Sequence, residues 1–135
     1  MQAVSNQIKV VLAEDDEAIA EAYRLGLGYH GFAIEVAADG REAITAIERQ
    51  IPDILLLDII MPNMNGLEVL EILRANEAHK NLPVIVLTNL GQRSDAERVQ
   101  ELGAKAYLIK ANLSLKDLVQ QIYDALDGTK LTSVG

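Results

Sequence analysis

The chain has 135 residues, enough for one domain with a sizeable core, and half of them are apolar. It has no cysteine and two histidines, which excludes disulfides, thiolate metal sites and thiol nucleophiles and leaves carboxylate, hydroxyl and amine chemistry. A net charge of −8 argues against direct nucleic-acid binding by this domain, because such binding depends on Lys and Arg neutralising phosphates.

Apolar runs and amphipathic stretches alternate along the chain. The apolar runs predict strands at residues 8–13, 32–37, 54–57, 84–87 and 107–109. Apolar residues at helical spacing predict helices at about residues 17–29, 41–50, 94–102 and 115–126, with a further helix striped by Leu67, Leu70 and Leu73. Strands that alternate with helices predict a doubly wound α/β fold with a parallel sheet and right-handed connections.

The sequence predicts one domain with a short tail at each end. We expect one domain over residues 8–127, with an N-terminal tail at 1–7 and a polar tail or linker stub at 128–135. No apolar run approaches the roughly 20 residues that a membrane span needs, and Lys9 interrupts any signal-peptide pattern. We therefore expect a cytoplasmic protein with no membrane insertion.

The residues that end the predicted strands form a chemically coherent set. Glu14 and Asp15 follow the first strand, Asp58 the third, Thr88 the fourth and Lys110 the fifth, at the sheet edge where α/β proteins bind ligands. Converging carboxylates repel one another, and a hard dication such as Mg²⁺ relieves that repulsion. Lys110 can pair with one carboxylate or with a phosphoryl oxygen, and Thr88 offers a hydroxyl donor. This set would let an ionised Asp58 attack a phosphoryl group.

These motifs resemble the receiver domain of response regulators, the phosphoacceptor module of two-component signalling. The resemblance covers nearly the whole chain, and its most specific segments are residues 10–16, 52–66, 87–88 and 102–110. It implies a flavodoxin-like (βα)₅ three-layer sandwich with five parallel strands in the order 2-1-3-4-5.

The resemblance also implies a role for each site residue. Asp58 is the phosphoacceptor, Asp15 a direct ligand of Mg²⁺ (with Mn²⁺ as an alternative), and Glu14 acts largely through water. The backbone carbonyl of Ile60 is a further metal ligand. Lys110 matches the family's invariant lysine.

The family's mechanism is a two-state switch. A sensor histidine kinase or phosphotransfer protein donates the phosphoryl group, Thr88 moves toward it, and Tyr107 rotates inward. The surface of the fourth helix, fifth strand and fifth helix then signals to a downstream protein of unknown identity. The resemblance implies that the protein catalyses only its own phosphorylation and dephosphorylation. It also implies that the protein is a monomer or a weak phosphorylation-dependent dimer. Because the chain ends shortly after the fifth helix, we expect output by protein contact or from a part outside this chain.

Three departures from the family pattern carry predictions. Ala111 follows Lys110 where the family usually has proline after a cis bond; we expect a cis bond here despite a cost of about 3–4 kcal/mol, so that the lysine reaches Asp58. Asn89, together with Ile60 and Leu90, would hinder the hydrolytic water and give a slowly decaying phosphoaspartate. The segment 104–107 lacks the acidic pair found in the largest DNA-binding subfamily, which argues against its charge-paired dimer.

Other interpretations remain open. A receiver-like scaffold that binds partners without phosphorylation is the main alternative. A phosphatase of the haloacid dehalogenase type needs an acid two residues after the nucleophile, where this chain has Ile60. A flavin carrier of the same fold is disfavoured by three acids in the first loop. Among the remaining polar residues, Asp16 is expected to cap the first helix, and His30 and His79 to face solvent.

Overall fold

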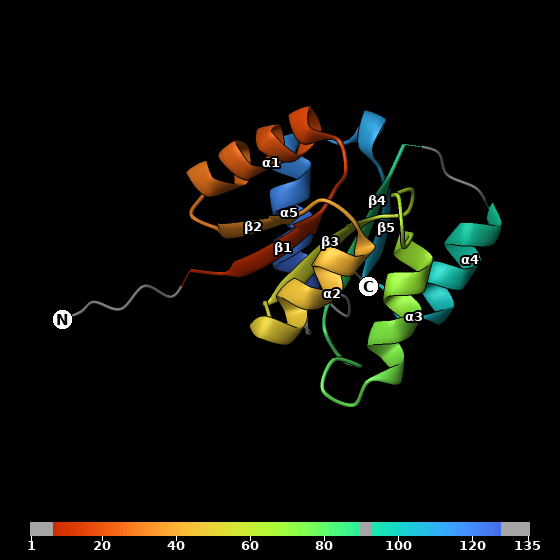
Figure 1. The fold of residues 1–135 in the computed structure, drawn as a ribbon. Helices are drawn as coiled ribbons and strands as arrows, with labels where there is room; N and C mark the ends of the chain where they lie inside the picture. Colours follow the sequence, from red (N-terminus) through yellow and green to blue (C-terminus); the bar gives the residue numbers. More distant parts are fainter. Residues whose placement is uncertain (1–6, 90–92, 128–135) are drawn as a thin grey trace.

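The computed structural model describes residues 7–89 and 93–127, which form one sheet flanked by helices (Figure 1). The strands are β1 (Lys9–Ala13), β2 (Ala33–Ala37), β3 (Ile54–Asp58), β4 (Val84–Thr88) and β5 (Ala106–Ile109). The helices are α1 (Glu17–Tyr29), α2 (Gly40–Arg49), α3 (Gly66–Ala75), α4 (Arg93–Glu101) and α5 (Leu115–Leu126). A short 3₁₀ helix, η1 (Lys110–Asn112), follows β5.

The sheet has the predicted topology. Its strand order is β2-β1-β3-β4-β5, and every neighbouring pair is parallel. Ala13 lies opposite Leu57, and Thr88 lies opposite Ile109. The carboxyl ends of β1, β3, β4 and β5 therefore meet at one edge, which confirms the predicted fold class and places the strand-end residues together.

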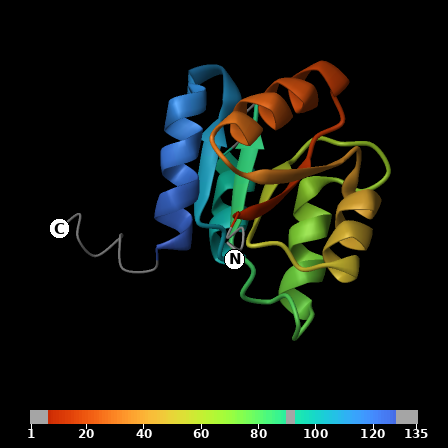
Figure 2. The ribbon, with the colours of Figure 1, turned by 90° about the vertical axis from the view of Figure 1, so that its left-hand side faces the viewer.

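Alternate residues of the strands build two cores, one on each face of the sheet. Val11, Leu55 and Val86 point toward α2, α3 and α4, and their neighbours Leu12, Leu56 and Leu87 point toward α1 and α5. Figure 2 shows the two helix layers on opposite sides of the sheet. Because both faces are covered, β3 and β4 are buried along their whole length, as continuous apolar runs require. Among the helices of the described residues, none combines the length and the apolarity of a membrane span.

Side-chain caps fix where the helices begin. The Asp16 carboxylate accepts a hydrogen bond from the Ile19 N–H at 3.0 Å, which confirms Asp16 as the cap of α1. Ser114 and Asp117 form a reciprocal capping box at the start of α5. Such a cap stabilises a helix by about 1 kcal/mol, so the starts of α1 and α5 are encoded locally.

The two histidines differ in exposure. His30 is exposed at the end of α1, as predicted. The prediction for His79 is wrong, because this residue is buried with 7% of its surface exposed. Its N–H donates to the Asn76 carbonyl and its own carbonyl accepts from the Leu82 N–H. These two turns fold the segment between α3 and β4 back onto the protein, so a residue in a polar stretch lies inside.

Candidate functional site

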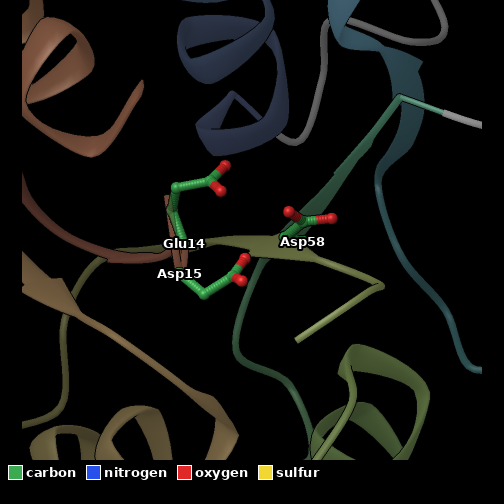
Figure 3. Close-up of side chains that lie close together, drawn as sticks. All are labelled: Glu14, Asp15 and Asp58. Atoms are coloured by element: carbon green, nitrogen blue, oxygen red, sulfur yellow. The ribbon is translucent and has the colours of Figure 1, made fainter. Parts of the chain in front are cut away.

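Three carboxylates gather where β1 and β3 end side by side. Glu14 and Asp15 follow β1, and Asp58 is the last residue of β3 (Figure 3). Each offers an oxygen, and these oxygens lie within 4.8 Å of one another. Glu14 and Asp58 are buried, with 3% and 7% of their surface exposed, whereas Asp15 is exposed. The predicted acidic cluster is therefore formed, with one side open to solvent.

Lys110 connects two of these carboxylates. Its Nζ donates to Asp58 Oδ2 at 2.9 Å and also to Glu14 Oε1. The lysine side chain is only 7% exposed, so both ion pairs are shielded from water. The sequence suggested that Lys110 would pair with one carboxylate, and the structure pairs it with two.

The prediction of a cis bond after Lys110 is wrong. The described residues contain no cis peptide bond, so the bond from Lys110 to Ala111 is trans. The chain enters η1 directly after β5, and the Leu113 N–H donates to the Lys110 carbonyl at 3.1 Å. With a trans bond and this turn, the lysine reaches both carboxylates. A cis bond, which costs free energy before a non-proline residue, is therefore not needed to place the lysine.

Burial and pairing shift the protonation of this pair. Burial raises the pKa of Glu14, and hydrogen bonds from Lys110 and from the Asp16 N–H offset only part of that effect. Burial alone would lower the pKa of Lys110, but its hydrogen bonds to Glu14 and Asp58 outweigh burial and the pKa is raised. Lys110 therefore stays charged, and Glu14 is the group whose charge is costly.

Thr88 and Tyr107 lie where the strand pattern predicted. Thr88 is the last residue of β4 and is fully buried. The residue before it, Leu87, lies opposite Asp58 in the sheet. Tyr107 is in β5 opposite Val86 and packs against the core between the sheet and α2, α3 and α4. Its hydroxyl oxygen is already buried. The ring as a whole is partly buried, and the inward rotation of Tyr107 stays a prediction.

Two of the three residues expected to screen Asp58 lie just beyond the ends of β3 and β4. Ile60 is 60% exposed, and its N–H donates to Asp58 Oδ1 at 3.2 Å. Asn89 is exposed just beyond β4. The prediction for Leu90 falls outside the described residues.

The loop after Asp58 depends on contacts that the sequence did not reveal. A Cβ on Gly66 would lie 2.2 Å from the Asp58 carbonyl oxygen, so only glycine fits there. The side-chain amide of Asn63 donates to Asp39 Oδ2 at 2.7 Å and joins this loop to α2. The sequence shows an Asp before a helix start, at Asp39, and an Asn-rich loop around Asn63. Neither feature indicates which residue the other would contact.

The geometry defines the chemistry that this cluster can perform. Clustered carboxylate oxygens are the ligands of a hard dication such as Mg²⁺, and the backbone carbonyl of Ile60 belongs to the adjoining loop. Lys110 orients the Asp58 carboxylate through one of its oxygens. Lys110 follows β5 and Thr88 ends β4, and both carry donors that suit an added anionic group. The arrangement fits transfer of a phosphoryl group to a carboxylate.

Comparisons with known proteins agree with this geometry. Response regulators named MprA from Mycobacterium leprae and Mycobacterium ulcerans are each 38% identical to the chain, over 91% and 92% of it. The chain spans about half the length of these relatives, 53% and 52%.

Solved structures give the same result. The chemotaxis protein CheY4 of Vibrio cholerae is 27% identical, with a TM-score of 0.82 over 89% of this chain and 99% of that one. A putative response regulator from Chloroflexus aurantiacus is 30% identical, with a TM-score of 0.83 over 90% of this chain and 98% of that one. The family described as the response regulator receiver domain matches residues 10–123. The chain therefore belongs to the response-regulator receiver domains of two-component signalling.

Proposed function

We propose that Asp58 accepts a phosphoryl group from a sensor histidine kinase or a phosphotransfer protein. The observation that carries this proposal is the buried Asp58 carboxylate, held 2.9 Å from Lys110 Nζ and clustered with Glu14 and Asp15. A carboxylate in this setting is oriented by its hydrogen bond, and it is surrounded by groups that can balance the charge of a transferred phosphate.

In the transfer, a carboxylate oxygen of Asp58 attacks phosphorus. The bond from phosphorus to the donor's histidine nitrogen breaks, and its electron pair returns to the imidazole. Lys110 balances charge on the phosphoryl oxygens. Glu14, Asp15, Asp58 and the Ile60 carbonyl would hold Mg²⁺ or Mn²⁺, which supplies further neutralisation of these oxygens. Dephosphorylation is a separate hydrolysis. A water oxygen attacks phosphorus, the bond from phosphorus to the Asp58 oxygen breaks with its electron pair returning to the carboxylate, and a proton of the water passes to solvent as inorganic phosphate is released.

The signal is proposed to leave the site through Thr88. Its hydroxyl would donate to the new phosphoryl dianion, and any movement of β4 would reach β5 and Tyr107, which pack beside it. The output surface is proposed to be α4, β5 and α5, read by an unidentified downstream protein. We propose a monomer or a weak phosphorylation-dependent dimer, with no direct nucleic-acid contact by this domain.

We further propose that the phosphoaspartate decays slowly. Ile60 is exposed at the mouth of the site and presents an apolar side chain to an incoming water. Asn89 adds bulk just beyond the end of β4. Exchange of Ile60 for Asn should shorten the lifetime, and a half-life of seconds in the unmodified protein would contradict the proposal.

The proposal is tested by intact mass after incubation with acetyl phosphate. The expected result is one phosphoryl adduct that requires Mg²⁺ and is absent in Asp58→Asn. Absence of the adduct in the unmodified protein, with Mg²⁺ binding measured independently, would favour the phosphorylation-independent scaffold.

A further inference from the structure

We propose that the hydrogen bond from Asn63 to Asp39 is a positioning contact for the metal-binding loop between β3 and α3. This inference rests on the proposed function, because it assumes the cation site formed with the Ile60 carbonyl. It concerns residues that touch neither the cation nor the phosphoryl group. The contact joins α2 to the loop and fixes the loop's outer side.

One side of the loop is fixed directly at Asp58. The Gly66 N–H donates to the Ile59 carbonyl at 2.8 Å, which closes residues 59–66 into a compact turn. The missing side chain of Gly66 lets α3 begin against the Asp58 backbone. Ile59 and Met61 are buried in the core and flank exposed Ile60. The position of Ile60 is therefore limited from the side of the sheet.

The outer side of the loop is fixed by Asn63. This residue has φ = 68°, the only positive φ outside glycine in the described residues. A left-handed conformation is uncommon outside glycine, and Asn tolerates it better than most residues. The side-chain amide of Asn63 donates a hydrogen bond from Nδ2 to Asp39 Oδ2 at 2.7 Å. The Met64 N–H donates to the Pro62 carbonyl at 2.7 Å across Asn63, and the side-chain contact to Asp39 adds a second restraint on this conformation.

Asp39 provides a rigid attachment point. Its other oxygen accepts from the Glu42 N–H at 2.9 Å and caps α2. Hydrogen bonds from the Glu42 N–H and from Asn63 hold the pKa of Asp39 below its usual range, so it stays an acceptor at neutral pH. A Cβ on Gly40 would lie 2.3 Å from the Met64 carbonyl oxygen, so the loop also presses on the first residue of α2.

These contacts act on the cation site through pre-organisation. A loop that is already ordered does not lose conformational freedom when its carbonyl binds a cation. Partners one step outside the ligands typically change metal affinity by about 10- to 100-fold. Because Asn63 lies three residues from Ile60, we expect a smaller loss of Mg²⁺ affinity, about threefold to tenfold.

The test uses two single variants and their combination. Asn63→Gly removes the side chain but tolerates the positive φ. Asp39→Ser keeps a cap for α2 but cannot reach Asn63. Asn76→Ala is the matched control, because it removes a loop hydrogen bond to the Ala78 N–H at the far edge of the sheet. Mg²⁺ dissociation constants come from isothermal titration calorimetry, and amide exchange of Ile60 and Gly66 is followed without Mg²⁺.

The expected result is a threefold to tenfold weaker Mg²⁺ affinity and faster exchange of the loop amides in both single variants, with about the same loss in the double variant. The control should match the unmodified protein. Unchanged Mg²⁺ affinity in both single variants would overturn the positioning role, as would fully additive losses in the double variant. Failure of the unmodified protein to bind Mg²⁺ would instead overturn the proposed function, together with the cation site itself.

Discussion

Lys110 balances the charge of the site. Three carboxylates and one ammonium leave a net charge of −2 in a largely buried cluster. Two of the carboxylates, Glu14 and Asp58, share the lysine. Removing one partner of a buried ion pair leaves an uncompensated charge, which costs more than the pair itself contributes.

Replacement of Lys110 by methionine should therefore lower stability. We expect the free energy of unfolding to fall by about 3 kcal/mol at pH 7 in EDTA, because both buried carboxylates lose their donor. Urea denaturation measures this change. Lys116→Met, at an exposed position on α5, is the control and should change stability little. A loss below about 1 kcal/mol for Lys110→Met would show that the carboxylates are hydrated instead.

Glu14 should give stability a particular pH dependence. Its folded-state pKa is raised, so between its ordinary pKa and the raised value the folded state binds more protons than the unfolded state. Its contribution to stability is therefore present at low pH and is lost as the pH rises through the raised pKa. Compared with Glu14→Gln, the unmodified protein should lose relative stability from pH 4.5 to pH 7, measured by urea denaturation in EDTA. A relative gain over this range would contradict the assignment.

At the scale of the elements, the start of α3 and the end of β3 are locked together at Gly66. A methyl group there would meet the Asp58 carbonyl oxygen at 2.2 Å and the Ile59 Cα at 2.9 Å. Since both atoms are backbone, β3 or α3 must shift. Overpacking of this kind typically costs about 1–3 kcal/mol.

Gly66→Ala should destabilise the protein by about that amount and weaken Mg²⁺ binding, because the shift falls on Asp58. Gly28→Ala in α1 is the matched control, since a Cβ there has no neighbour within 4 Å. The control should be neutral or stabilising by about 0.5 kcal/mol through helix propensity. Thermal unfolding of the two variants provides the comparison, and equal effects would contradict the packing argument.

The elements were predictable to the extent that local signals specify them. Apolar periodicity gave α1 and α5 with their observed bounds, and Asp16 was predicted as the cap of α1. Continuous apolar runs ending in Asp58 and Thr88 gave the buried strands and the site at their ends. The strand order came from the family resemblance, because periodicity does not determine which strands are neighbours.

The failures have a common physical origin in the path of the backbone, which makes both tight turns and contacts between distant residues. His79 is buried by turns that close around it, and the trans bond after Lys110 depends on η1. The contact between Asp39 and Asn63 joins residues 24 positions apart. Each requires the path of the backbone, which residue types alone do not give.

At the scale of the whole molecule, cation binding should be linked to folding. The carboxylates come from two strands, so the site exists only in the folded chain. At a free Mg²⁺ concentration tenfold above the dissociation constant, the unfolding free energy should rise by about 1.4 kcal/mol. Asp15→Asn should abolish this gain, and urea denaturation with and without Mg²⁺ tests it. An equal gain in Asp15→Asn would place the ion elsewhere.

The most direct test of the central claim is to locate the phosphoryl group by chemical trapping. Borohydride reduces an acyl phosphate of aspartate to homoserine, so reduction after incubation with acetyl phosphate and Mg²⁺ marks the acceptor for peptide mass mapping. We predict homoserine at position 58 and none in the sample incubated without Mg²⁺. Modification at another residue, or none in a protein that binds Mg²⁺, would contradict Asp58 as the phosphoacceptor.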